Sequence, residues 1–377
     1  MKKFLLSAML LCAAFAMTAQ QTAVQTSAAQ PAAAQASEPS TVYFIKDITP
    51  ESLLKVYHAL GVKPEGRVAV KISTGESEES NQLSPALIKD LVQEVQGTLV
   101  ECNTAYRGNR YDTESHLREV AKRGYDKIAP VEIMDADGEI GLPMADTTHF
   151  KFDIVGKGLG KYDCMINLAH FKGHAMGGFG GVLKNQSIGV ASRDGKALIH
   201  TAGVNATAAN NAAFRNPKGQ DAFIESMAGA AQAVHNHFDG KVIYIDVMNN
   251  MSVDCDCNGH PAKPVLKDMG ILCSLNPVAL DKACVDLVFT HNSTADDDSQ
   301  PLIDRINRQH GTYILDYAEK IGLGNKAYKL IDITGDKPVE CYNVYDAEGH
   351  KVLDMATSLD SLKPGNYIVN GTPYCME

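Results

Sequence analysis

The sequence contains no tryptophan, and aromatic residues make up only 7% of its 377 residues. This scarcity argues against a surface that stacks sugar rings on aromatic side chains. The chain also lacks a basic stripe or an arginine-rich run, and its net charge is −10 at pH 7. Because nucleic-acid binding needs clustered positive charge, this composition argues against DNA or RNA as a partner. Hydrophobic residues make up 45% of the chain, which is enough to bury a large core.

Beyond its N-terminus, the chain lacks an apolar run long enough to cross a membrane. Two lysines precede the apolar run Phe4–Ala16, which ends in a small-x-small cleavage pattern. We therefore expect residues 1–19 to be a signal peptide and the protein to be periplasmic or secreted. Cys12 lies within the apolar run, but the bulky Leu11 before it disfavours processing as a lipoprotein. Residues 20–40 are rich in Ala, Gln, Ser and Pro and predict a disordered linker.

The chain lacks the closely spaced CxxCxxC runs that hold iron–sulfur clusters. It has nine cysteines, and eight remain when Cys12 of the signal peptide is set aside. An even number permits disulfides in an exported protein, although the spacing is unlike that of a small disulfide scaffold. Cys164, Cys273 and Cys284 lie within apolar strand or helix patterns, and we expect them to be buried small hydrophobic residues.

Apolar strands alternate with helices along residues 41–333. Lys241–Val247 is one such strand, and pairs such as Ser84-Pro85 give a helix an N-cap followed by proline. One helix is expected over Pro301–Ile321. The alternation predicts an α/β domain with a mainly parallel sheet and helices on both faces. Ligands of such sheets bind beyond the carboxyl ends of the strands.

Residues 334–377 differ from the rest of the chain. They hold short alternating runs separated by turn sequences such as Ala347-Glu348-Gly349, and they predict a small β appendage. The pattern VYDAEGHKV…LKPGNYIVNG resembles the C-terminal sorting tails of exported Bacteroidetes proteins. That resemblance implies contact between this tail and an export machinery.

The segment 162–185 carries the densest group of candidate site residues. After a short apolar strand it brings together imidazoles, amines and bare backbone: His170, Lys172, His174, Gly177, Gly178, Gly180, Gly181, Lys184 and Asn185. Glycine-rich backbone with lysine suits a phosphate or carboxylate, so the four glycines, Lys184 and Asn185 are candidates to bind a cofactor or another anionic ligand. Ser192 and His200 extend the same region.

Lys172 and His174 are the candidate catalytic residues of this segment. His170 and His174 are four residues apart, a spacing that zinc sites use on helices, but the flanking glycines argue against a helix. Two plainer interpretations remain open. The imidazoles could hydrogen-bond the backbone of a tight loop, and the glycines could serve close packing of this loop on the sheet.

A second group, DCDCNGH, follows the strand Lys241–Val247. A Cys-x-Cys pair within a strand points both sulfurs the same way, and two thiolates with an imidazole suit a soft or borderline metal ion. The candidate metal ligands are Cys255, Cys257, His174 and either His170 or His260. A disulfide or inert thiols are the alternatives. Asp246, near the end of the strand, is either a catalytic residue or a cap for the next turn.

Six segments together resemble a known family: ECNTAYRG, DADGEIGLP, HFKGHAMGGFGGVLKNQSIG, KALIHTAG, VDCDCNGHPAKP and DMGILCSLNPVALDKACVDLV. In this order, over roughly residues 41–330, they resemble domain of unknown function 362. Members of that family are often described as uncharacterised iron–sulfur-centre proteins, and some carry a ferredoxin-type cluster module whose cysteine runs this chain lacks. The resemblance places weight on Lys172, His174, the glycines, Lys184, Asn185, Cys255 and Cys257.

Three functions follow as hypotheses. The first is a protein with a redox-related role that binds a metal ion or a metallocofactor, such as an iron–sulfur centre. The second is a metal-free enzyme that acts on a small anionic substrate, with Lys172 as electrophile and His174 as general acid or base. The third is an exported binding protein without catalysis. The distance between the sulfurs of Cys255 and Cys257 and the ring of His170 or His174 tests the first.

Overall fold

The computed structural model describes residues 38–209 and 214–377. The predicted signal peptide and all but the last residues of the predicted linker lie outside these ranges. The described residues belong to one compact unit.

The strands are β1 (Ser40–Ile45), β2 (Val68–Lys71), β3 (Thr98–Glu101), β4 (Val131–Ile133), β5 (Glu139–Pro143), β6 (Phe152–Gly156), β7 (Cys164–His170), β8 (Lys172–His174), β9 (Gly178–Gly180), β10 (Val242–Met248), β11 (Gly270–Ser274), β12 (Tyr328–Asp332), β13 (Val339–Asp346), β14 (Lys351–Ala356), β15 (Gly365–Val369) and β16 (Thr372–Met376). The α-helices are α1 (Pro50–Ala59), α2 (Pro85–Glu94), α3 (Thr113–Arg123), α4 (Val182–Ser187), α5 (Arg193–His200), α6 (Gln220–His237), α7 (Pro277–Thr290), α8 (Gln300–Arg308) and α9 (Tyr313–Lys320).

One large sheet dominates the fold, with the strand order β16-β15-β13-β12-β1-β11-β10-β7-β2-β3-β4. Strands β4, β3, β2, β7 and β10 run parallel to one another. β11 lies antiparallel between β10 and β1, while β12 is parallel to β1. The predicted α/β class is confirmed, and the parallel part of the sheet is the part that leads to the candidate site.

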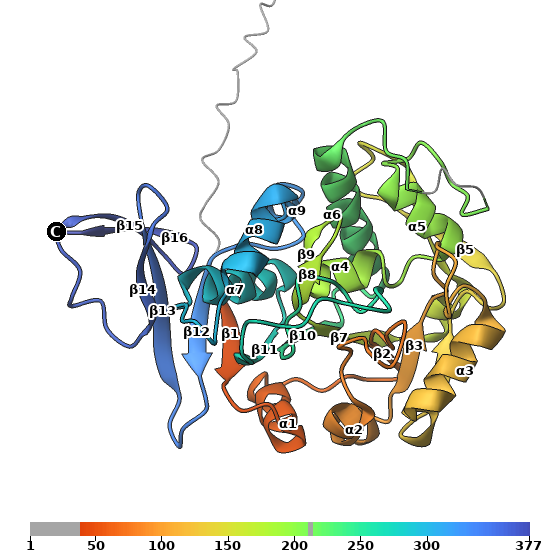
Figure 1. Ribbon diagram of the computed structural model, residues 1–377, viewed down its shortest axis with the longest axis horizontal. Coiled ribbons are helices and arrows are strands. Elements are labelled where there is room, and N and C mark those ends of the chain that lie inside the picture. The colour runs from red at the N-terminus through yellow and green to blue at the C-terminus, as the bar shows by residue number, and fades with distance from the viewer. Residues whose placement is uncertain (1–37, 210–213) are drawn as a thin grey trace, which may run out of the picture. The chain divides into compact units, whose positions relative to one another are not determined.

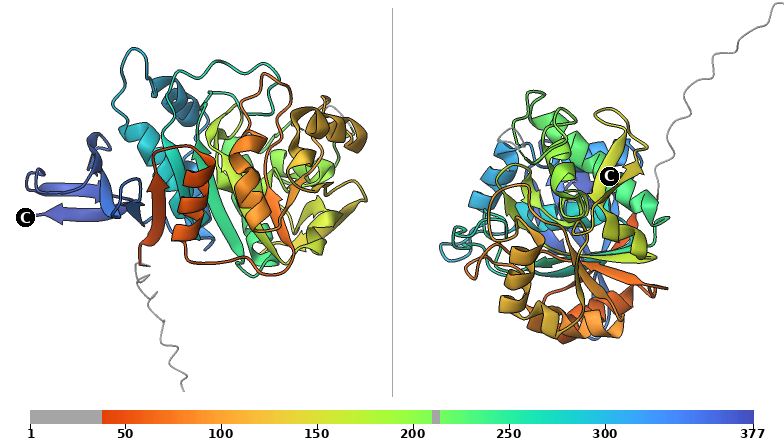
Figure 2. Two further views of the ribbon diagram at one scale, coloured as in Figure 1. Left: turned by 90° about the horizontal axis from the view of Figure 1, so that it is seen from below. Right: turned by 90° about the vertical axis from the view of Figure 1, so that its right-hand side faces the viewer.

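Helices cover both faces of this sheet (Figures 1 and 2), as the alternation of buried side chains predicts. On β10, Ile243 and Ile245 pack into the cluster that includes the apolar faces of α1, α2 and α3. Val242 and Tyr244 pack into the opposite cluster, with α4, α6, α7 and α9. Both sides of β10 are apolar because both sides are covered.

The helix predicted over Pro301–Ile321 is two helices in the structure, so that prediction was wrong. α8 and α9 are separated by a turn in which His310 has a φ of 51°. The turn brings Gly311 against the short β8–β9 hairpin, where a Cβ atom on Gly178 would lie 2.8 Å from the Gly311 Cα. A continuous helix would not leave room for this backbone-to-backbone contact.

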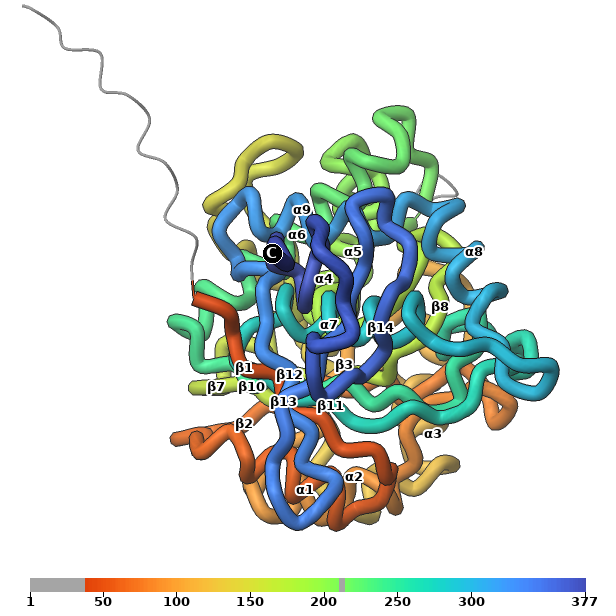
Figure 3. The backbone as a smooth tube through the Cα atoms, turned by 90° about the vertical axis from the view of Figure 1, so that its left-hand side faces the viewer, coloured from red at the N-terminus to blue at the C-terminus, as the bar shows by residue number. Residues whose placement is uncertain are grey.

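The C-terminal strands continue the main sheet (Figure 3). β13 pairs antiparallel with β12, with Leu330 opposite Cys341, and it also pairs with β14 and β15. A small core of its own, which includes Val344, Leu362 and Val369, lies beneath these strands. The predicted β structure of this segment is therefore present, attached by strand pairing to the α/β body.

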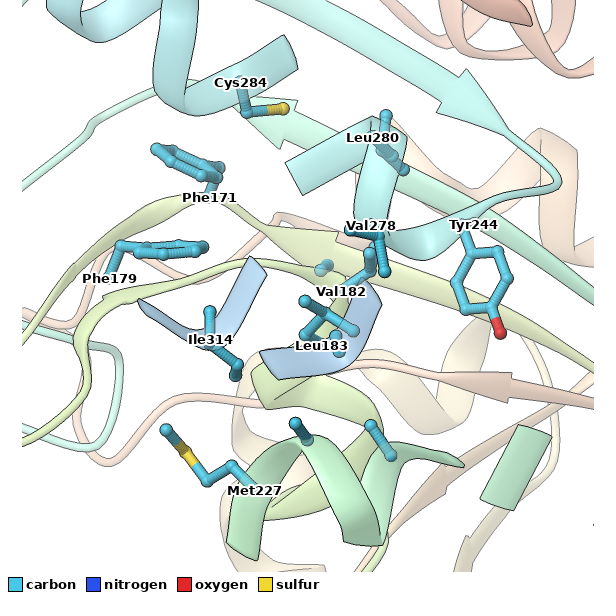
Figure 4. Close-up of a cluster of buried hydrophobic side chains, with 14 of the residues drawn as sticks. Phe171, Phe179, Val182, Leu183, Met227, Tyr244, Val278, Leu280, Cys284 and Ile314 are labelled. Carbon is cyan, nitrogen blue, oxygen red and sulfur yellow. The ribbon is translucent and has the colours of Figure 1, made fainter. Parts of the chain in front are cut away.

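The core beside the candidate site lies between α4, α6, α7 and α9 (Figure 4). Phe171 follows β7 and Phe179 lies in β9, and their rings stack with centroids 5.5 Å apart. Val182 and Leu183 of α4 are buried in the same cluster. This packing fixes the β8–β9 hairpin and the start of α4, from which most of the predicted site residues project.

Candidate functional site

A pocket of about 180 Å³ lies beyond the carboxyl ends of β2, β3 and β7. Lys71 and Glu101 are the last residues of β2 and β3, and Lys172 and His174 follow β7. Cys255 and Cys257 reach the pocket from the long connection between β10 and β11. The pocket therefore lies at the strand ends, where ligands of parallel sheets bind.

Asp256, between the two cysteines, ties their loop to the β7–β8 segment. Its carboxylate lies 2.8 Å from His170 Nδ1 and 3.0 Å from Lys172 Nζ, and only 2% of the Asp256 side chain is exposed. Burial alone would raise the pKa of Asp256, but His170 and Lys172 together hold this pKa well below its ordinary value. The two segments predicted to share one site are joined by this buried carboxylate.

His174, Cys255 and Cys257 form the candidate metal-binding group. Their potential ligand atoms all lie within 4.8 Å of one another, and the side chains of His174 and Cys255 are buried. In the structure Cys255 and Cys257 are joined to each other by a disulfide. A metal ion would require the reduced pair, since thiolates are the ligand form.

Two imidazoles in the pocket have opposite hydrogen-bonding character. His174 Nδ1 accepts hydrogen bonds from the backbone N–H groups of Gly177, at 2.8 Å, and Met176, at 3.3 Å, so the hydrogen of the neutral ring lies on Nε2. His200 Nδ1 donates to the carbonyl oxygen of Lys196 at 2.7 Å, so His200 Nε2 carries a free lone pair.

Both rings are held neutral. Burial, followed by the positive charge of Lys184, lowers the pKa of His174 well below its ordinary value. Burial lowers the pKa of His200 to about 4. Phe223 stacks on the His200 ring at a centroid distance of 5.0 Å and holds it in place. One imidazole is thus a hydrogen-bond donor and the other an acceptor at neutral pH.

The described residues that line the pocket carry more positive than negative charge. Its cations are Lys71, Arg110, Lys172, Lys184 and Lys196, and its carboxylates are Glu101 and Asp256. Glu101 bonds Lys71 Nζ at 3.1 Å and Arg110 Nη1 at 3.1 Å. Burial alone would raise the pKa of Glu101, but these two cations hold it at about 2. A basic pocket of this kind suits a small anion.

Lys184 differs from the other pocket cations because its ammonium has no hydrogen bond or ion pair among residues 38–209 and 214–377. Its side chain is partly accessible and lines the pocket. Burial, followed by the charges of Lys172 and Lys71, lowers the pKa of Lys184 to about 7. The pocket therefore contains an amine that is largely uncompensated and close to its titration point at neutral pH.

Asp246 does not line the pocket. It is fully buried under α7, and a hydrogen bond links its carboxyl group to Asp281. Asp281 accepts hydrogen bonds from the backbone N–H groups of Val182 and Leu183 at 2.9 and 3.0 Å. Burial, followed by the negative charge of Asp281, raises the pKa of Asp246 well above its ordinary value. The structure therefore places Asp246 beside a helix-capping carboxylate and away from the pocket.

Three of the four predicted glycines pack against protein and do not line the pocket. Gly178 adjoins Gly311, and Gly177 lies beside the His174 ring. A Cβ atom at Gly180 would make only ordinary contacts with lysine side chains. Gly181 does line the pocket, and a Cβ there would overlap the Asp281 carboxylate. Close packing accounts for most of this glycine cluster.

Asn185 lines the pocket, as expected of a candidate ligand-binding residue, and it also links the elements around the pocket. Its Nδ2 donates to the Lys71 carbonyl oxygen at 3.1 Å and to Asn167 Oδ1 at 2.7 Å. Its Oδ1 accepts from Lys71 Nζ at 3.2 Å. This amide therefore holds α4 against β2 and β7.

His170, His260 and Ser192 lie outside the metal-binding group. Both ring nitrogens of His170 are engaged, Nδ1 with Asp256 and Nε2 with the backbone carbonyl of Asn249 at 2.6 Å. His260 is exposed and pairs with Glu79 on the surface. Ser192 caps α5 by accepting from the Gly195 N–H at 3.0 Å.

The sequence reasoning missed Lys71, Glu101, Arg110 and Lys196. A signal for the first two was present, since each is a charged residue near the end of an apolar run, and they are the last residues of β2 and β3 in the structure. Charged side chains at the carboxyl end of buried parallel strands are candidates for a site by the same rule that selected His170. Arg110 and Lys196 gave no comparable local signal.

The family comparison matches residues 68–286 to the family described as Domain of unknown function (DUF362). The chain belongs to the DUF362 family. The match covers more than half of the 377 residues and contains each lining residue of the pocket named above. The DUF362 region therefore includes the whole candidate site, while the strands β12 to β16 lie beyond it.

None of the curated proteins matches this DUF362 chain. Among solved structures, it is similar to a lactate racemase apoprotein from Thermoanaerobacterium thermosaccharolyticum, with 14% identity over 55% of this chain and 50% of that one and a TM-score of 0.32. It is also similar to a protein from Thermotoga maritima, with 11% identity over 73% of this chain and 60% of that one and a TM-score of 0.35. The chain thus spans 50–60% of the lengths of these proteins, and likenesses of this strength carry no functional argument.

No helix within the described residues is long and apolar enough to span a bilayer. The longest, α6, has 18 residues and includes charged and polar side chains along its length.

Proposed function

We propose that this DUF362 protein binds a metal ion, alone or within a metallocofactor, through Cys255, Cys257 and His174. The observation that carries the proposal is the convergence of these three donors within 4.8 Å of one another in the wall of a basic pocket. Two sulfur donors and one imidazole suit zinc and the softer transition metals. The pocket leaves room for a fourth ligand from an anionic small molecule.

The pocket supports the thiolate form that a metal ion needs. Lys172 and Lys184 line the same cavity as the two cysteines, and nearby positive charge lowers the pKa of a thiol. Because the same pair can close as a disulfide, metal binding in this protein would depend on the redox state of Cys255 and Cys257. This dependence is the redox-related role that we propose.

His174 would be the weaker of the three ligands. Coordination through Nε2 would move the ring hydrogen to Nδ1, where it would displace the hydrogen bond from the Gly177 N–H. The hairpin would therefore need to adjust when the metal binds. We expect the two thiolates to contribute most of the affinity.

The proposal is tested by metal analysis of the full chain, reduced under anaerobic conditions and incubated separately with zinc, iron and nickel. We expect stoichiometric metal in the reduced protein, a large loss in Cys255→Ser and Cys257→Ser, and a smaller loss in His174→Ala. Cys375→Ser is the matched control, because Cys375 is an exposed free thiol far along the chain. Equal metal content in Cys255→Ser and the unchanged protein would overturn the proposal.

A metal-free enzyme acting on a small anionic substrate is the second candidate function. The hydrogen bond from Gly177 to His174 Nδ1 favours it, because it leaves Nε2–H as a donor and not a metal ligand. In this function His174 would act as general acid and His200 Nε2 would be available as a base. Lys172, which also pairs with Asp256, would face the substrate as an electrophile.

Thermal unfolding in the presence of ligands separates the two candidates. The second predicts that phosphate or dicarboxylates raise the melting temperature in the presence of a chelator, compared with chloride at equal ionic strength. Lys184→Gln should reduce that increase. Stabilisation that disappears with the chelator would favour the metal proposal, and a ligand bound but always recovered unchanged would favour a binding protein without catalysis.

We also propose that the protein is exported to the periplasm or secreted. The support is the charged start, apolar run and small-residue cleavage pattern of residues 1–19, together with a C-terminal segment that resembles sorting tails. N-terminal sequencing of protein from the producing cell tests the first part. An intact N-terminus in the mature protein would contradict it.

A further inference from the structure

Lys184 differs from the other lysines of the pocket in the bonding of its amine. Lys71 bonds Glu101 and Asn185, Lys172 bonds Asp256, and Lys196 donates to the carbonyl oxygen of Ala191. Among the residues that the structure describes, the Lys184 amine has no such partner. An ammonium that is largely removed from water and has no partner is costly, so this position is unusual for a lysine that serves only the fold.

The surroundings of Lys184 favour an uncharged amine. Lys172 and Lys71 are its strongest cationic neighbours, Arg110 is a weaker one, and only Asp256 acts in the opposite direction. These groups come from β8, β2 and the loops after β3 and β10, the elements that enclose the cavity. Desolvation together with a neighbouring cation is a known way to make a lysine nucleophilic.

We propose that Lys184 is a nucleophile that forms an imine with a small anionic molecule bearing an aldehyde or ketone group. The partly accessible, unpaired amine lines a pocket that also contains Arg110 and Lys172, whose positive charges would bind the anionic group of the same molecule. A carboxylate or a phosphate would serve equally as that group. The ligand class is therefore carbonyl compounds of 2-oxo acid or phosphorylated aldehyde type.

The reaction is balanced without an added oxidant or reductant. The Lys184 nitrogen attacks the carbonyl carbon, and a C–N bond forms. The carbonyl oxygen then leaves as water with the two hydrogens of the amine, and a C=N bond remains. His174, whose Nε2 carries a hydrogen and lines the same pocket, is a suitable donor to the departing oxygen.

The test is reductive trapping of the full chain with pyruvate or glyceraldehyde 3-phosphate and borohydride, followed by peptide mass spectrometry. We expect the Lys184 peptide to gain the mass of the carbonyl compound, less water, plus two hydrogens. At pH 7 an ordinary lysine is only about 0.04% neutral, so labelling of Lys184 should exceed that of exposed lysines at least about tenfold. Labelling of Lys184 should be half-maximal near pH 7.

Two variants control the experiment. Lys184→Arg keeps a positive charge and should abolish the label, while Lys89→Arg changes an exposed lysine of α2 that does not line the pocket and should leave the label in place. Labelling spread evenly over surface lysines, or a label that persists elsewhere in Lys184→Arg at the same level, would overturn the proposal. So would the absence of any adduct with both carbonyl compounds.

The trapping experiment can succeed or fail independently of the metal proposal. Cys255→Ser removes a proposed metal ligand but leaves the Lys184 amine and its cationic neighbours in place. Trapping in Cys255→Ser with no metal binding would support the imine alone, while stoichiometric metal binding without trapping would support the metal site alone.

Discussion

At the scale of single residues, Glu101 connects the pocket to the stability of the fold. It lies at the end of β3, and its carboxylate bonds Lys71, Arg110 and the Thr74 N–H, the last at 2.8 Å. All three bonds are buried. Arg110 also pairs with Glu76 at 3.2 Å, whereas Glu101 is the carboxylate that pairs with Lys71. Removing one member of such a group leaves buried charges unpaired.

We predict that Glu101→Gln lowers the free energy of unfolding at pH 7 by about 3–5 kcal/mol, measured by urea denaturation. Glu94→Gln is the control, because Glu94 forms an exposed pair with His58. Its effect should stay within about 1 kcal/mol. An equally small effect at Glu101 would mean that water or an anion already compensates Lys71 and Arg110.

Glu101 also gives a prediction of how the free energy of unfolding depends on pH. The pKa of Glu101 is about 2 in the folded protein, below its ordinary value of 4.5, so its stabilising contribution is complete above pH 4.5 and is lost as the pH falls towards 2. The contribution is on the order of 3 kcal/mol. The difference in stability between the unchanged protein and Glu101→Gln should therefore shrink between pH 4.5 and 2, and a constant difference would contradict this assignment.

At the scale of elements, the β8–β9 hairpin is held against the cysteine loop by a glycine that the sequence reasoning did not select. A Cβ atom on Gly173 would overlap the backbone carbonyl of Val253, and the Gly173 N–H donates to the Ser252 carbonyl oxygen at 2.8 Å. Backbone atoms cannot move aside as a flexible side chain can. Gly173 therefore sets the distance between His174 and the loop of Cys255 and Cys257.

We predict that Gly173→Ala lowers the stability of the protein by about 1–3 kcal/mol and weakens metal binding by the reduced cysteines. Gly180→Ala is the matched control, because Gly180 lies opposite Lys172 in the same hairpin and its Cβ would make only ordinary contacts, the nearest at 3.5 Å. Urea denaturation and metal titration of both variants provide the measurement. Equal behaviour of the two variants would show that the hairpin is not held by this contact.

These elements also show what the sequence could predict. The alternation of apolar strands and helices predicted the sheet, and the strand-end rule brought His174 together with Cys255 and Cys257 although 81 residues separate His174 from Cys255. The rule did not place Asp246 in the pocket, because its partner Asp281 belongs to another element and no local pattern records that contact. The hydrogen-bond direction at His174 was likewise beyond prediction, since it depends on the turn at Gly177.

At the scale of the whole described unit, the C-terminal strands are joined to the α/β body through buried polar contacts. Asp286 of α7 accepts hydrogen bonds from Tyr328 of β12 and Tyr345 of β13, both at 2.8 Å. Thr290 of α7 also donates to Asp354 of β14 at 3.0 Å. The same helix, α7, also carries Asp281, which caps α4 beside the site. One helix therefore contacts both the C-terminal strands and the wall of the site.

The strands β13 to β16 could be either a detachable sorting tail or an integral part of the sheet, and these two alternatives predict different effects of their removal. If β13 to β16 were independent of the body, their removal would leave its stability unchanged. The structure gives the opposite expectation, because removal would uncover the fully buried Leu330 on β12 and take Tyr345 from the buried Asp286. Unpaired strand edges with apolar side chains also promote association between chains.

We predict that a chain ending after residue 337 unfolds at a lower temperature than the full chain and associates in solution, as measured by calorimetry and light scattering.

Tyr345→Phe tests one contact of these strands without removing them. It should lower the free energy of unfolding by about 1–3 kcal/mol, because it removes one hydrogen-bond donor from a buried carboxylate. Tyr374→Phe, whose hydroxyl donates a weak hydrogen bond to Met376 Sδ at 3.7 Å, should have almost no effect. A truncated chain that stays monomeric and melts with the full chain would instead establish β13 to β16 as a separable appendage, as a tail removed during export would need to be.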